Sequence, residues 1–147
     1  AAAREHTISC RKRYKRGTDM ALEKGTSLTV EVRVDESNVA SAVGSGLLAV
    51  FATPAMIAQM ENAAYRCMAR GLSEGQASVG TRIEVEHLSA TPIGLAVAIT
   101  ATVSGVAGRR VEFDLTASDK AGLVGKGTHT RFIVDAERFM AKARQKL

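Results

Sequence analysis

The sequence predicts an α+β domain in which an antiparallel, curved sheet wraps around one central helix. Three observations predict this fold class: one helical segment carries an apolar stripe, five segments alternate apolar and polar residues, and short turns join the last four of these. The chain has 147 residues, of which 46% are hydrophobic. That length suffices for one domain with its own core, without disulfides or metals.

The N-terminal 25 residues form a distinct basic segment. They carry seven basic and three acidic side chains, a net charge of +4, whereas the whole chain carries +5. We expect a solvated basic arm over 1–25 and the folded domain over 26–147. A single basic run with one aromatic residue does not make a nucleic-acid-binding domain, so nucleic acid is not an expected partner.

The cysteines and the hydropathy pattern bear on the compartment. Cys10 and Cys67 show neither a metal-ligand nor a redox spacing, which favours a reduced, cytoplasmic setting. No apolar run is long enough to span a bilayer, and the N-terminus lacks the apolar segment of a signal peptide. We expect a cytoplasmic protein with no metal site and no membrane contact.

The first strand and the segment after it come before the helix. Leu28, Val30, Val32 and Val34 alternate with polar residues, which predicts a half-buried strand. Residues 36–50 are small and rich in Gly and Ser. They predict a loop or short lid that enters the helix.

The central helix is predicted from about residue 54 to 70. Thr53-Pro54 favours its start, because Thr is a good N-cap and Pro suits the first helical position, and Gly71 marks its end. At 100° per residue, the apolar side chains fall in one stripe about 120° wide. The stripe consists of Met56, Ile57, Met60, Ala64, Cys67 and Met68.

Four further strands and a terminal helix complete the predicted domain. The strands are expected at about 81–87, 95–103, 110–115 and 124–134, and a basic helix at about 135–145. Strands joined by short turns pair antiparallel, and the long helix needs the concave face of that sheet. This is the hotdog arrangement. Its exposed sheet edges favour pairing of two subunits, so we expect a homodimer or a larger assembly.

Three polar side chains lie on or beside the predicted apolar surface. Glu61 follows Thr53 by about 80° and about 12 Å along the helix, at the rim of the stripe, where a carboxylate is costly unless paired or used. Thr53 either caps the helix or stands where free backbone N–H groups stabilise an oxyanion. His87 is in register with Ile83 and Val85, so it is either a core histidine or a catalyst.

The spacing of these residues resembles a known family. The matching segments are Val50–Ala55, Glu61, Val79–Thr81, Val85–His87 and Thr91–Gly94. Over about residues 28–135 they are similar to the fluoroacetyl-CoA thioesterase family of hotdog proteins. The resemblance implies hydrolysis of an acyl-CoA to free acid and CoA. It implies no cofactor, because CoA is part of the substrate.

The resemblance also implies roles for individual residues. Thr53, Glu61 and His87 would form the catalytic set, Gly80 would lie beside the thioester, and Arg131 would help to hold the CoA. Glu61 is either a general base or a nucleophile that forms an anhydride. Thr53 either bonds Glu61 or positions the nucleophile, and His87 either polarises the carbonyl or protonates the thiolate. His87 works either with the Glu61 of its own subunit or with that of the partner subunit, and the sequence leaves both open.

The segment before the helix departs from the specialised member of this family. That enzyme has a lid with aromatic side chains, whereas this chain has no aromatic residue between Tyr14 and Phe51. The resemblance therefore favours a small acyl group other than fluoroacetyl.

Two other functions remain open from the sequence. One is a non-catalytic hotdog module that binds acyl-CoA and regulates. The other is a hydratase or dehydratase, whose usual Asp/His pair on a loop–helix motif we do not find here.

Overall fold

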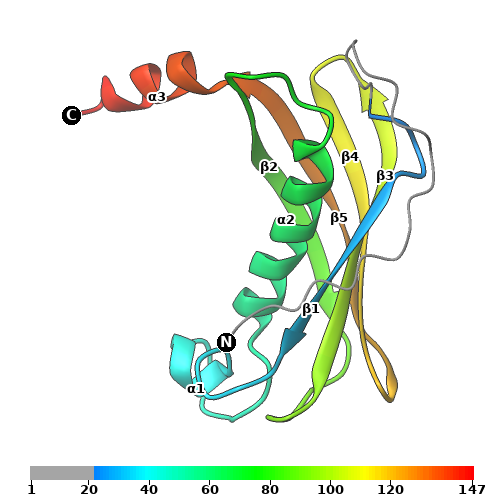
Figure 1. Cartoon of the computed structure of the whole chain (residues 1–147). Helices are drawn as coiled ribbons and strands as arrows, with labels where there is room; N and C mark the ends of the chain where they lie inside the picture. The colour runs from blue at the N-terminus through cyan, green and yellow to red at the C-terminus, as the bar shows by residue number, and fades with distance from the viewer. Residues whose placement is uncertain (1–21) are drawn as a thin grey trace.

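The computed structural model describes residues 22–147 (Figure 1). Most of the predicted basic arm lies outside these residues. Leu22 packs against the core, and the backbone N–H of Gly25 donates to the carbonyl of Val103 at 2.8 Å. The last residues assigned to the arm therefore contact the folded domain.

The order of elements matches the prediction, with one short helix added. The elements are β1 Ser27–Arg33, α1 Ala40–Val43, α2 Thr53–Ala69, β2 Gln76–His87, β3 Ala96–Ala107, β4 Arg110–Asp119, β5 Gly122–Asp135 and α3 Ala136–Arg144. The five strands form one antiparallel sheet in the order β1-β3-β4-β5-β2. Figure 1 shows α2 lying along the inner face of the curved sheet. The predicted α+β hotdog fold is confirmed.

The core lies between α2 and the sheet. The buried side chains of α2 are Met56, Met60, Ala63, Ala64, Cys67 and Met68. They differ from the predicted stripe by one exchange: Ala63 is buried and Ile57 is only partly buried. A Cβ at Gly125 of β5 would lie 2.7 Å from Sδ of Met56, so the helix packs closely against the sheet at this point.

A β-bulge in β2 changes which of its residues face the helix. The register shifts between Gly80 and Arg82, and this leaves Thr81 without a Cα partner on β5. Thr81 is exposed, whereas Ile83, Val85 and His87 are partly buried. An extra residue in one strand shifts the alternation beyond it. Gly80 consequently lies on the side that faces α2.

The C-terminal helix projects from the end of the sheet. Asp135 caps α3 by accepting a hydrogen bond from the backbone N–H of Arg138 at 2.8 Å. None of the α3 residues is buried, and Figure 1 shows the helix pointing away from the body of the domain. In the range 22–147, no helix combines the length and apolarity that crossing a membrane requires.

Candidate active site

The first turn of α2 brings Thr53 and His87 together. The predicted role of Thr53 as N-cap is wrong, because the N-cap is Ala52 and Thr53 is the first helical residue. Its hydroxyl oxygen instead lies 2.7 Å from Nδ1 of His87, the last residue of β2. The hydroxyl is therefore bonded to an imidazole and not to the helix end.

The other ring nitrogen of His87 is in a different situation. Nε2 is enclosed and has no hydrogen-bond partner among residues 22–147. Burial lowers the pKa of His87 below its ordinary value of 6.5, and a hydrogen bond with the backbone of Ser89 opposes this shift. At neutral pH the ring is uncharged. If Nδ1 accepts from Thr53, Nε2 carries the proton and donates; in the other tautomer Nε2 accepts.

A pocket of about 310 Å³ lies beside this pair. Thr53 and His87 form part of its lining, which otherwise combines small and apolar side chains. These are Ala40, Ser45, Val50, Phe51, Leu88, Ser89 and Ala90. The pocket offers a small space of mixed polarity directly beside a hydroxyl and an imidazole.

Glu61 lies two turns further along α2, in a second polar cluster. Its Oε1 is 3.9 Å from Nε2 of His129, and its side chain is 44% exposed. A Cβ built on Gly80 would lie 2.7 Å from the same carboxylate oxygen. The carboxylate therefore lies against bare backbone at Gly80 and keeps one side open to solvent.

Arg131 provides a buried cation in this cluster. It is 7% exposed. Its Nε donates to the hydroxyl of Ser78 at 3.0 Å and its Nη2 to the carbonyl of Ser78 at 2.9 Å. Burial lowers the pKa of Arg131 below its ordinary value, and the Glu61 carboxylate opposes that shift. These two hydrogen bonds, together with a third to His129, compensate for burying this charge.

His129 is a buried member of the cluster that the sequence left without a role. Its side chain is 0% exposed, and its Nδ1 lies 2.7 Å from the carbonyl oxygen of Arg82. A carbonyl only accepts, so Nδ1 carries the proton. Nε2 then accepts from Nη1 of Arg131 at 3.2 Å. The only sequence signal was its position two residues before Arg131, on the same strand face.

The structure thus divides the predicted site residues into two groups. Thr53 lies with His87, whereas Glu61 lies with Gly80 and Arg131. Eight helical residues place Thr53 and Glu61 about 12 Å apart along the axis. The hydroxyl of Thr53 is bonded to His87, so the predicted alternative of a Thr53–Glu61 hydrogen bond is not formed within the described chain.

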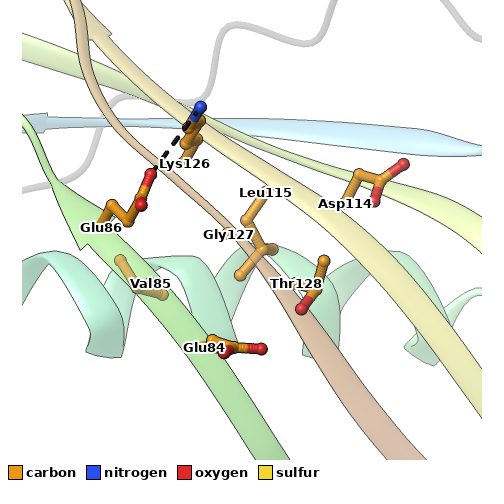
Figure 2. A pocket seen from close by; sticks show the side chains of 8 residues that line it. All are labelled: Glu84, Val85, Glu86, Asp114, Leu115, Lys126, Gly127 and Thr128. Atoms are coloured by element: carbon orange, nitrogen blue, oxygen red, sulfur yellow. Dashed lines mark ion pairs between the residues drawn. The ribbon is translucent and has the colours of Figure 1, made fainter.

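A larger hollow of about 470 Å³ is lined by residues of β2, β4 and β5 (Figure 2). Val85, Leu115 and Gly127 contribute to its lining, together with the charged side chains of Glu86 and Lys126. Nζ of Lys126 is 3.7 Å from Oε2 of Glu86. None of the predicted site residues lines this hollow, so its size does not make it the candidate active site.

Comparison with known proteins identifies relatives of the whole domain. A family model described as a fluoroacetyl-CoA-specific thioesterase matches residues 34–137. The fluoroacetyl-CoA thioesterase of Streptantibioticus cattleyicolor is 46% identical over 97 residues, which cover 66% of this chain and 70% of that protein.

Solved structures agree with this result. The structure of the fluoroacetyl-CoA thioesterase FlK is similar with a TM-score of 0.82 and 36% identity, covering 86% of this chain and 98% of that chain. A thioesterase superfamily member from Thermus thermophilus has a TM-score of 0.80 at 25% identity, covering 86% and 93% of the two chains.

Proposed function

This chain belongs to the fluoroacetyl-CoA-specific thioesterase family of hotdog proteins, and from that premise we propose that it hydrolyses a small acyl-CoA with Thr53, Glu61 and His87 as its catalytic residues. The predicted family and the predicted class of enzyme, an acyl-CoA thioester hydrolase, are confirmed by its relatives. The observation that supports the residue assignment most is the 2.7 Å contact between Thr53 and His87. It orients an imidazole whose second nitrogen has no partner in the described chain.

Hydrolysis of a thioester needs a nucleophile, stabilisation of the oxyanion and a proton for the leaving thiolate. Glu61 either takes a proton from a water that adds to the carbonyl carbon, or adds itself and forms an anhydride that water then opens. In both routes the C–S bond breaks and the CoA thiolate gains a proton. Nε2 of His87 is suited to contact the carbonyl oxygen or the departing sulfur, and Thr53 fixes the ring.

Gly80 and Arg131 are proposed to contact the substrate near its thioester. The bare backbone of Gly80 leaves room beside Oε1 of Glu61, which any side chain would fill. Arg131 uses three of its five N–H groups on Ser78 and His129, so two remain. Its burial supports a role at the thioester end of the CoA, away from the phosphates.

The separation of Thr53 and His87 from Glu61 supports a homodimer. Strand β2 carries both Gly80 and His87, and it forms one edge of the sheet. Pairing of two copies along this edge would remove an exposed strand edge and bring the two groups of site residues close together. In this arrangement His87 acts with the Glu61 of the partner subunit. We place this dimer in the cytoplasm, because Cys10 and Cys67 show neither a metal-ligand nor a redox spacing.

A thiol-release assay tests the activity. The purified protein is given acetyl-, propionyl-, isobutyryl-, benzoyl- and fluoroacetyl-CoA, and release of CoA is followed. We expect turnover of the small acyl-CoAs, and a loss of about 100-fold or more in Glu61→Ala and His87→Ala, the size of a general acid–base contribution. Binding of acyl-CoA without turnover would instead support the regulatory module. Wild-type turnover in both variants would remove the residue assignment.

A mixing experiment tests the shared site. Glu61→Ala and His87→Ala chains, each inactive, are unfolded together and refolded. If each site joins His87 of one subunit to the Glu61 of the partner subunit, half of the dimers are mixed and each has one intact site. Activity then recovers to about a quarter of the wild-type value. No recovery would place the whole site within one chain.

A further inference from the structure

We propose that His129, as the tautomer with its proton on Nδ1, is a positioning residue that holds Arg131 in place beneath the Glu61 carboxylate. This inference rests on the proposed function, because His129 acts through Glu61. It assigns a role to a buried imidazole on β5 that the proposed chemistry does not otherwise use.

The tautomer follows from the partners of the ring. The carbonyl oxygen of Arg82 lies 2.7 Å from Nδ1 and accepts only, so that nitrogen must donate. The guanidinium of Arg131 donates only, so Nε2 at 3.2 Å must accept. A neutral ring satisfies both contacts at once. A doubly protonated ring satisfies one and places two N–H groups against each other at the second.

The ring also occupies a fixed place. Its centroid is 6.4 Å from that of Phe113 on β4. A Cβ on Gly80 would lie 2.9 Å from Cε1 of His129, 3.4 Å from Nη1 of Arg131 and 2.7 Å from Oε1 of Glu61. The imidazole, the guanidinium and the carboxylate therefore all lie around one glycine. Movement of any one of them changes the space left for the other two.

The charges around His129 determine the effect of acid. Glu61 faces it from α2 and Arg131 from its own strand, whereas its cross-strand neighbours Phe113 and Ile83 are apolar. Burial lowers the pKa of His129, the carbonyl of Arg82 opposes this, and Arg131 lowers it further. When the ring is protonated, Nε2 loses the hydrogen bond from Arg131 and its new N–H faces Oε1 of Glu61 at 3.9 Å. The carboxylate needed for hydrolysis then faces a cation, and Arg131 keeps only its two hydrogen bonds to Ser78.

Two substitutions separate positioning from folding. His129→Phe fills the space but offers no acceptor to Arg131, whereas His129→Gln offers an amide oxygen. In the thiol-release assay near neutral pH we expect His129→Phe to lose about tenfold in kcat, the rate equivalent of one charged hydrogen bond, with little change in KM. His129→Gln should recover most of kcat and lose activity less steeply in acid than the wild type. Thr128→Val, on the exposed neighbouring residue of β5, is the matched control.

Nitrogen NMR of the imidazole provides a readout on the unsubstituted protein. The expected signature for His129 is a neutral ring near pH 7 with a protonated Nδ1 and a bare Nε2. A proton on Nε2, or wild-type kcat in both His129 variants while Glu61→Ala is inactive, would overturn the inference. Full turnover in Glu61→Ala is a different result, because it would refute the proposed function and leave the NMR signature as it is.

Discussion

The two groups of site residues, one around Thr53 and one around Glu61 of α2, are built in opposite ways. At the start of the helix, Thr53 and His87 form a pair beside a pocket, and the ring of His87 keeps a nitrogen without a partner among residues 22–147. Two turns later, Glu61 lies near Arg131, a cation held by three hydrogen bonds. In the first group one ring nitrogen makes no hydrogen bond within residues 22–147. In the second, hydrogen bonds hold the cation near the carboxylate that we propose as general base or nucleophile.

This difference predicts which substitutions affect stability. A buried cation that loses one of its partners remains buried and incompletely paired, which is costly. Changes at His129 or Ser78 should therefore affect both folding and activity. Thr53 is exposed, and among residues 22–147 its hydroxyl makes a hydrogen bond to the ring of His87. Changes there should affect activity alone, so comparing kcat with the free energy of unfolding tests the distinction.

The largest effect is expected for Glu61→Gln. This change keeps the shape of the side chain and removes its charge, so kcat should fall about 1,000-fold, within the range of acid–base catalysis. Stability should change little, because the side chain is 44% exposed and Arg131 keeps its bonds to Ser78 and His129. Thiol release and thermal unfolding measure the two effects.

The control for Glu61→Gln is Glu84→Gln. Glu84 is an exposed carboxylate whose Oε2 pairs with Arg82 at 2.9 Å. A similar loss of kcat in both variants would mean that general charge, and not the position of Glu61, determines the rate.

The next largest effect is expected for Thr53→Val. Removing the hydroxyl leaves Nδ1 of His87 without its 2.7 Å partner, so kcat should fall by about 10- to 100-fold. A helix cap would also cost about 1 kcal/mol of stability, but Thr53 makes no capping bond, so the free energy of unfolding should stay the same. Thr53→Ser keeps the hydroxyl and should keep most of kcat. A clear loss of stability in Thr53→Val would restore the capping role.

Alternation and helical periodicity predicted the fold well. The apolar stripe of α2 and the alternating strands report burial directly, and burial drives this fold. The capping prediction for Thr53 was wrong by one residue. The N-cap is set by the backbone angles of Ala52, which are extended, and residue preferences alone do not place that boundary.

The candidate site could be predicted only in part. The spacing pointed to Thr53, Glu61 and His87, but it did not reveal that they form two separate groups. The bulge at Thr81 has no signal in the alternating pattern, yet it sets which face Gly80 occupies. The partners of His129 come from β2 and α2, which are distant in sequence, so its role depends on the pairing of strands.

A smaller effect is expected for Gly80→Ala. The new Cβ would lie 2.7 Å from Oε1 of Glu61, the end of a flexible side chain that is able to move away. The fold should remain intact. The displaced carboxylate should lower kcat about tenfold, a loss whose free-energy equivalent is comparable to the strain of modest overpacking. Gly105→Ala is the control, since its Cβ would lie 3.7 Å from Oε2 of Glu112, an ordinary van der Waals contact. Equal losses in both variants would show a general effect on the sheet.

The smallest effect is a dependence of stability on pH that differs between the two groups. Burial lowers the pKa of His129 and of His87 below 6.5, so the unfolded chain binds protons at a pH where the folded chain does not. Stability should therefore be highest above pH 6.5 and fall as the pH drops below it, by about 1.4 kcal/mol for each unit of lowered pKa. The decline should end below the folded pKa values.

Urea unfolding of three proteins separates the two histidines. The side chain of His129 is 0% exposed, whereas His87 is only partly buried, so His129 should contribute the larger share of the decline. His129→Gln should remove more of the pH dependence than His87→Gln does, relative to the wild type. If His87→Gln removes more, His87 is the more strongly desolvated of the two histidines, and the proposed contrast between an open and a buried group is wrong.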